Sequence, residues 1–137
     1  AEILDKLAKF GITPESVTLW GTGTPMREFL WSEEMADASV HVLLNVDFKD
    51  TYVTGSRDIR NCHINVGTGK EVSIREVAEI IMKEIGFKGI LLWDSSKPDG
   101  TMRKLTDVSK LHSLGWHHKV EIDEGIERLY EWYLKGV

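Results

Sequence analysis

Two kinds of short apolar segment alternate along the 137-residue chain, and this alternation constrains the fold more than any other feature. Residues 73–86 carry apolar side chains at helical spacing and begin with a Ser73–Glu76 capping box, which predicts a helix. Residues 16–20 and 89–93 are short, rich in strand-forming side chains and bounded by glycine or polar loops. Strands separated by helices predict a small α/β domain, with short strands and about four helices.

The rest of the chain predicts further helices, one more strand and a polar connection. Ser32 and Asp107 are the expected caps of the helices that follow them. Residues 47–61 lack periodicity and indicate an exposed connection that has room for a short strand. The predicted helices cover residues 2–10, 32–46, 108–114 and 123–135, and the strand covers 62–66. The side chains expected to face inward from the second and the last of these helices are Met35, Ala38, Val42, Val46, Ile126, Leu129, Tyr130 and Tyr133.

Composition indicates one compact globular domain. Apolar residues make up 42% of the chain and charged residues 28%, which is enough for a core. The net charge of −5 disfavours a nucleic-acid-binding surface. The apolar runs are too short to span a membrane, and the single cysteine, Cys62, excludes an internal disulfide. We therefore expect a cytoplasmic protein with no membrane or nucleic-acid partner.

Three signatures of catalysis or cofactor binding are missing from the sequence. The G-x-G-x-x-G pattern for dinucleotides fails at residues 21–26 and 67–72, where Met26 and Val72 stand in place of the third glycine. None of the three tyrosines is followed four positions later by a lysine, as a Tyr-x-x-x-Lys reductase requires. The five histidines lack metal-ligand spacing. We expect no catalytic residue, no cofactor site and no metal site in this chain.

The stretch WGTGTPMR, residues 20–27, favours a pocket for an anionic ligand. A Gly-x-Gly turn lets backbone N–H groups approach a ligand without obstruction by a Cβ atom. Arg27 offers a planar fork that can hold phosphate at two points, and Trp20 offers a flat face for a sugar or a base. An arginine that is simply solvated after a turn would have the same local sequence.

A second polar loop, SSKPDGTMRK at residues 95–104, strengthens the hypothesis. Asp99 can accept hydrogen bonds from a ligand, and Lys104 with its neighbours adds positive charge. Taken alone, this loop also fits an ordinary turn with exposed bases. However, an otherwise acidic chain concentrates cations in two loops that both follow predicted strands, where α/β domains bind ligands.

At this point the sequence resembles the GDP-L-fucose synthase family, which belongs to the extended short-chain dehydrogenases/reductases. The resemblance rests on WGTGTPMREFLWSEEMADAS, HINVGTGKEVSIREVAEII and DSSKPDGTMRKLTDVSKLHSLGW, followed by EGIERLYEWYL. These stretches occur in order and cover nearly the whole chain. One departure is the stretch FLWSEEM, where members of the family often have a histidine before the acidic pair.

The resemblance implies that residues 1–137 are a carboxy-terminal GDP-sugar-binding domain without a complete Rossmann unit. The family's enzymes convert GDP-4-keto-6-deoxy-D-mannose to GDP-L-fucose by 3,5-epimerisation and NADPH-dependent 4-reduction. The implied substrate contacts are Trp20, Arg27, Asp99 and, on a looser match, Lys104. NADPH and the catalytic residues would belong to an amino-terminal domain of a longer protein, which would be a homodimer. This chain alone would bind no NADPH and would be inactive.

Two alternatives remain open at the level of sequence. The chain could be the substrate domain of another nucleotide-sugar epimerase or dehydratase, although PMREF and KPDGTMRK argue against this. It could also be a freestanding binding module without catalysis, since composition is compatible with an isolated α/β domain.

Overall fold

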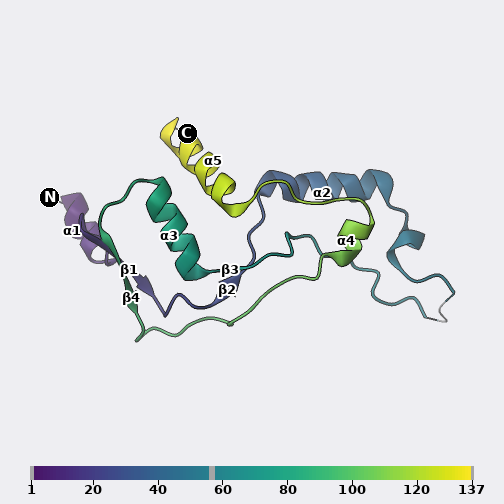
Figure 1. Cartoon of the computed structure of the whole chain (residues 1–137), viewed down its shortest axis with the longest axis horizontal. Helices are drawn as coiled ribbons and strands as arrows, with labels where there is room; N and C mark the ends of the chain where they lie inside the picture. The colour runs from purple at the N-terminus through teal and green to yellow at the C-terminus, as the bar shows by residue number, and fades with distance from the viewer. Residues whose placement is uncertain (1, 56–57, 137) are drawn as a thin grey trace. The chain divides into compact units, whose positions relative to one another are not determined.

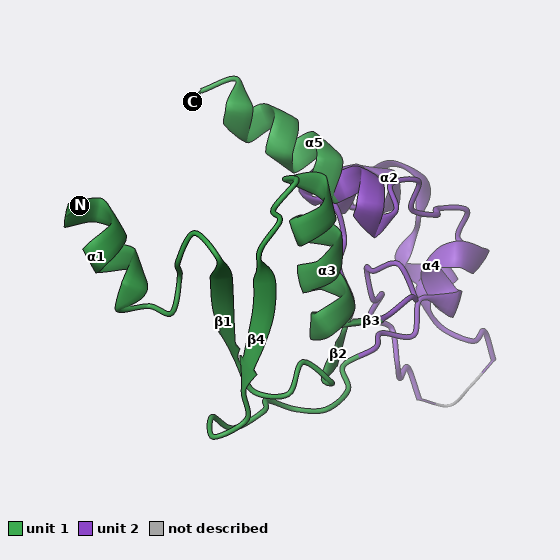
Figure 2. Cartoon of the chain, turned by 60° about the vertical axis from the view of Figure 1, so that its left-hand side comes forward, with its two compact units in different colours: residues 1–27, 72–104, 126–137 green, residues 28–71, 105–125 purple. Residues whose placement is uncertain are grey.

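The computed structural model describes residues 2–55 and 58–136, which form two compact units. Unit 1 comprises residues 1–27, 72–104 and 126–137, and unit 2 comprises residues 28–71 and 105–125 (Figure 2). The chain therefore passes between the units several times, and each unit is built from segments far apart in the sequence. This arrangement confirms a small α/β fold with short strands.

A two-stranded parallel sheet is the centre of unit 1 (Figure 1). Strand β1, Ser16–Trp20, pairs with β4, Ile90–Asp94, in a register that places Trp20 opposite Asp94. Because the strands are parallel, both end at the same edge of the sheet. The polar loops that follow them, residues 21–25 and 95–101, therefore begin side by side.

Helix α3, Ile74–Glu84, begins directly after a second small sheet in unit 1. This sheet pairs β2, Met26–Arg27, with β3, Val72–Ser73, in antiparallel orientation. The predicted capping box is confirmed, because Ser73 Oγ accepts the Glu76 amide and the Glu76 side chain accepts the Ser73 amide. The predicted helix therefore starts where its sequence indicates.

The apolar face of α3 is turned toward the parallel sheet. Apolar side chains of α3, β1 and β4 line one cavity of about 340 Å³, including Val17, Leu91 and Ala78. Ile81 and Ile85, which also line this cavity, remain 41% and 44% exposed. The helix and the sheet thus share a core that their own side chains do not completely fill.

The two terminal helices of the structure keep apolar side chains exposed. Helix α1, Glu2–Ala8, is shorter than predicted, and Gly11 beyond it adopts a φ of +76°. Helix α5, Ile122–Leu134, matches the predicted span within one residue. The prediction that Leu129 and Tyr133 face inward is wrong, because they are 54% and 70% exposed. Amphipathic spacing identifies an apolar face but does not supply the surface that covers it.

Unit 2 packs helices α2, Ser32–Asn45, and α4, Ser109–Ser113, around a small apolar core. Ala38, Leu111 and Trp116 form this core and are at most 5% exposed. The Trp116 indole Nε1 donates to Asp37 Oδ2 at 2.8 Å, so the polar atom of the buried ring is satisfied. The predicted helix boundaries of α2 and α4 are confirmed within one to two residues.

Several local predictions about unit 2 are wrong. Ser32 does not cap α2, since Trp31 occupies the N-cap position without a side-chain hydrogen bond. Met35 is 46% exposed rather than buried. Asp107 does accept the Ser109 amide at 2.9 Å, but Val108 is the N-cap of α4. The connection at 47–61 holds the 3₁₀ helix η1, Phe48–Thr51, and no strand among its described residues.

Residues 62–66, predicted as a strand, are irregular. In place of ladder bonds, the His63 carbonyl accepts from the Lys110 ammonium, and the Asn65 side-chain amide donates to the Asp107 carbonyl, both at 2.9 Å. A strand-like sequence without a neighbouring strand has no ladder to join. The described residues contain five α-helices, one in each segment predicted to be helical, and none of them is long and apolar enough to cross a membrane.

Replacing Leu111 by alanine tests the core of unit 2. Leu111 is fully buried, so we expect Leu111→Ala to lower the free energy of unfolding by about 2–5 kcal/mol in urea denaturation. Leu43→Ala is the matched control, because Leu43 lies on α2 in the same unit and is 81% exposed. Equal effects of the two substitutions would contradict this description of the core.

Candidate functional site

The turn at residues 21–25 joins β1 to β2 in unit 1 and is held by hydrogen bonds at almost every residue. The Gly21 amide donates to the Asp94 carbonyl at 2.9 Å, which extends the sheet by one step. The Gly23 and Pro25 carbonyls accept the first two amides of α3, from Arg75 and Ile74, at 2.9 and 3.0 Å. The turn thereby satisfies amides that a helix start leaves without partners.

Asp99 joins the second polar loop to this turn. Its Oδ1 accepts the Thr22 amide at 2.9 Å, and its Oδ2 accepts the Thr22 hydroxyl at 2.7 Å. The hydroxyl bond, followed by the amide bond, holds the pKa of Asp99 below its ordinary value. A Cβ atom at Gly21, whose φ is +81°, would collide with the Asp99 carboxylate, so glycine is required there.

One cavity in unit 1 brings three of the predicted site residues together. It has a volume of about 120 Å³, and its lining includes Trp20, Arg27 and Asp99. Lys104 is exposed and does not line it. The remaining lining residues come from the turn, the start of α3 and the loop after β4, and they are Gly23, Pro25, Ile74, Pro98 and Gly100.

Arg27 is the cation of this cavity. Its Nη1 donates to the Met26 carbonyl at 2.6 Å, and its Nη2 lies so close to Gly100 that a Cβ there would be 3.1 Å away. Arginine has five N–H donors, so the other donors of the fork remain able to bind an anion. The Lys97 ammonium lies 5.5 Å from the centre of the Trp20 ring, which is 75% exposed. The cavity thus combines positive charge with an accessible aromatic face.

Three backbone amides of this turn are already engaged within the protein. The amides of Gly21, Thr22 and Thr24 already donate within the protein, to Asp94, Asp99 and the Thr22 hydroxyl. The Arg27 side chain is therefore the charged donor that the lining offers to an anion. The glycines serve close packing instead, as at Gly23, where a Cβ would lie 2.6 Å from the Trp93 ring.

Glu28 organises a second glycine turn, in unit 2, and sequence reasoning missed it. Its Oε1 accepts the amides of Thr68 and Gly69 at 2.7 and 2.6 Å, while Oε2 accepts the Thr106 amide at 3.1 Å and the Thr106 hydroxyl. Burial raises the pKa of Glu28, but these bonds, led by the Thr106 hydroxyl, outweigh it and lower the pKa overall. The only feature of the sequence that pointed to Glu28 was the presence of a carboxylate next to Arg27.

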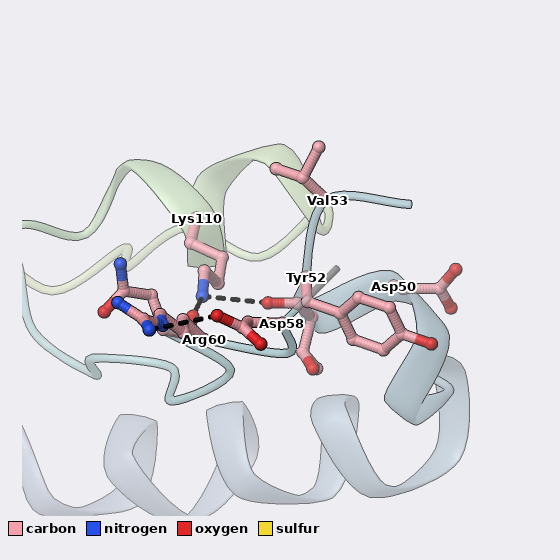
Figure 3. A pocket seen from close by; sticks show the side chains of 8 residues that line it. Asp50, Tyr52, Val53, Asp58, Arg60 and Lys110 are labelled. Atoms are coloured by element: carbon pink, nitrogen blue, oxygen red, sulfur yellow. Dashed lines mark hydrogen bonds and ion pairs between the residues drawn. The ribbon is translucent and has the colours of Figure 1, made fainter. Parts of the chain in front are cut away.

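A larger cavity, of about 680 Å³, lies in unit 2 and has its cation already engaged (Figure 3). The Lys110 ammonium donates to the carbonyls of Thr51 and His63, at 3.0 and 2.9 Å, and to that of Asn61. These three bonds use all three of its protons. Arg60 pairs with Asp58 at 3.0 Å along the same wall. The view shows Lys110 directed at the 51–63 segment, so we assign this lysine to structure.

Sequence comparison shows which proteins the chain is similar to. Residues 2–67 match the NAD dependent epimerase/dehydratase family. The chain is also 46% identical over 120 residues to the GDP-L-fucose synthase of Escherichia coli K12, and 50% identical over 123 residues to GDP-L-fucose synthase 1 of Arabidopsis thaliana. These alignments cover 88% and 90% of the chain, so the resemblance to this group of enzymes is confirmed.

Solved structures agree with the sequence comparison. A GDP-6-OMe-4-keto-L-xylo-heptose reductase from Campylobacter jejuni superposes on 99% of this chain with a TM-score of 0.91 and 45% identity. A GDP-mannoheptose C4 reductase of the same species, with NADP bound, covers 97% with a TM-score of 0.82 and 44% identity. The chain spans about a third of the length of its relatives, 36% of the E. coli protein and 38% of the first reductase.

The close approach of Gly21 to Asp99 can be tested by Gly21→Ala. Gly86 is the matched control, since it has a φ of +69° and no atom within 4 Å of a built Cβ. Gly86→Ala should cost about 1–2 kcal/mol of unfolding free energy from backbone strain alone. Gly21→Ala should cost about 1–3 kcal/mol more, because it displaces a hydrogen-bonded carboxylate. In an Asp99→Ala background the excess should disappear, and its persistence there would contradict the contact.

The loss of unfolding free energy at acidic pH should depend in part on Glu28. Its pKa is lowered from 4.5 on folding, so its contribution is complete above pH 4.5 and is lost as the pH falls through the lower folded value. We expect Glu28→Gln to lower the unfolding free energy by about 1–3 kcal/mol at pH 7 and by much less at pH 3. Urea unfolding at both pH values measures this, with the exposed Glu79→Gln as control. A loss of equal size at both pH values would argue against a stabilising role for the ionised Glu28 carboxylate.

Proposed function

We propose that this chain is the GDP-sugar-binding part of an NADP-dependent enzyme that converts GDP-4-keto-6-deoxy-D-mannose to GDP-L-fucose. The observation that carries the proposal is the 46–50% identity to GDP-L-fucose synthases over about nine-tenths of the chain. The cavity lined by Trp20, Arg27 and Asp99 supports it, because a cation and an aromatic face suit a nucleotide diphosphate. We take residues 1–137 as one functional domain of the longer protein.

Arg27 would bind the diphosphate. It is the one positively charged side chain among the described residues that line the cavity. Trp20 would pack on the sugar or the base through its exposed face. Asp99, held ionised by Thr22, would keep lone pairs for polar edges of the ligand. Lys104, exposed at the end of the same loop, would reach the outer phosphate oxygens. A cavity of 120 Å³ suits only part of a GDP-sugar, so another part of the longer protein would complete the site.

The two glycine turns of this chain do not fit the pyrophosphate of NADP(H). Dinucleotide sites present free amides at a glycine-rich turn to the pyrophosphate. Here the Thr68 and Gly69 amides bind Glu28, and the Thr22 amide binds Asp99. In the proposed enzyme the cofactor and the groups that make and break bonds would come from the amino-terminal domain. This chain would orient the 4-keto sugar by holding its diphosphate.

A second candidate is reduction of a GDP-linked heptose. The Campylobacter jejuni heptose reductases superpose over nearly the whole chain at 44–45% identity, close to the identity with the fucose synthases. All of these names share a GDP-linked sugar. Assay of the full-length protein with both 4-keto sugars separates the two. A freestanding module would bind GDP without turnover in any such assay.

The wider setting of the enzyme is inferred from the resemblance alone. We propose that the full-length protein is a cytoplasmic homodimer, with no nucleic-acid or membrane partner. We also propose that the 137-residue chain by itself neither binds NADPH nor turns over substrate.

Arg27→Ala in the full-length protein tests the proposed site. The loss of one charge-assisted hydrogen-bonding group should raise the Kd for GDP, measured by calorimetry, about 10- to 100-fold. NADPH affinity should not change, since Arg27 would touch only the GDP-sugar. Lys83→Ala, which removes an exposed cation from the last turn of α3, is the charge-matched control. GDP affinity that is unchanged in Arg27→Ala, or lowered equally in Lys83→Ala, would refute the site.

A further inference from the structure

Arg75, the second residue of α3, reaches back to the turn that carries the candidate site. Its Nη2 donates to the Thr22 carbonyl at 2.7 Å, and its guanidinium carbon lies 4.5 Å from the centre of the Trp93 ring. The backbone amide of Arg75 donates to the Gly23 carbonyl at 2.9 Å. Arg75 itself does not line the cavity, whereas its neighbour Ile74 does. The arginine thus touches the turn and not the space for a ligand.

Thr22 is held from two directions by these contacts. Asp99 accepts its amide and its hydroxyl, while Arg75 donates to its carbonyl. The peptide groups on both sides of this residue therefore have fixed orientations. Because Asp99 is followed by Gly100, which lies against the Arg27 fork, the contacts continue from Arg75 to the cation of the cavity.

The Trp93 ring contacts both the glycine turn and Arg75. Gly23 packs against its ring so closely that a Cβ would lie 2.6 Å away, and Arg75 stacks on the same ring. A planar guanidinium can stack and donate a hydrogen bond at the same time. A lysine at position 75 keeps the positive charge but lacks the planar guanidinium that contacts the Trp93 ring and donates to the Thr22 carbonyl. Arg75→Lys therefore separates the effect of charge from the effect of these two contacts.

We propose that Arg75 is a positioning residue for the GDP-sugar site: it fixes the Thr22 peptide and, through Asp99 and Gly100, the location of the Arg27 guanidinium. This inference rests on the proposed function, since it concerns the affinity of that same site. It assigns to the start of α3 a role in ligand affinity that involves no contact with the ligand.

A double-mutant cycle in the full-length protein tests the proposal. Arg75→Lys should raise the Kd for GDP about 5- to 10-fold, the equivalent of one lost hydrogen bond or cation–π contact. In an Arg27→Ala background the same change should alter GDP affinity by less than about 2-fold, since residues that act through each other are not additive. The Kd for NADPH and kcat at saturating substrate should stay constant, and Lys83→Ala should match the wild type.

Hydrogen exchange at the Thr22 amide gives a readout that does not need the ligand. Its bond to Asp99 should open more often in Arg75→Lys, so exchange should quicken about 5- to 10-fold while the urea midpoint of global unfolding stays unchanged. Unchanged exchange, unchanged GDP affinity, or equal losses in both Arg27 backgrounds would overturn the role of Arg75. If the wild type failed to bind GDP, the proposed function would fail, and the exchange measurement alone would then decide the positioning role.

Discussion

The bond between the Asp99 carboxylate and Thr22 is the interaction on which the candidate site depends. It joins the loop after β4 to the turn after β1 at two points, 2.9 and 2.7 Å long, across 77 residues of sequence. Parallel pairing of the two strands brings both loops to one edge, and this bond then fixes them to each other. Without it the turn that joins Trp20 to Arg27 would lose its tie to the loop that carries Asp99.

The same tripeptide, Gly-Thr-Gly, occurs at residues 21–23 and 67–69, and in both places a carboxylate accepts amides of the turn. Asp99 binds the first turn beside a cavity with an arginine, whereas Glu28 binds the second from a position close to Thr106. Glycine is needed at both turns because a side chain would strike the carboxylate. A carboxylate that accepts an amide of the turn leaves that amide unable to bind a ligand anion. In the proposed site the anion would therefore be bound by the Arg27 side chain.

Much of the local structure could be predicted from the sequence, because it depends on neighbours in the chain. The capping box of α3 and the two strands of the parallel sheet follow from spacing over a few residues. The strand at residues 62–66 and the inward orientation of Leu129 and Tyr133 in α5 were predicted incorrectly, because both depend on segments distant in the sequence. A strand needs a partner and an apolar face needs a cover, and neither is encoded by the segment itself.

The sequence by itself determined which chemical groups are available: one arginine after a glycine turn, an aspartate in a proline-glycine loop, and no complete dinucleotide or Tyr-x-x-x-Lys pattern. Only the tertiary structure decided that Trp20, Arg27 and Asp99 share a cavity, that Lys104 stands outside it, and that Glu28 and Arg75 hold the neighbouring turns. The physical reason is distance along the chain. Hydrogen bonds between residues 40 to 80 positions apart form only once strand pairing has brought their loops together, and no local pattern specifies them.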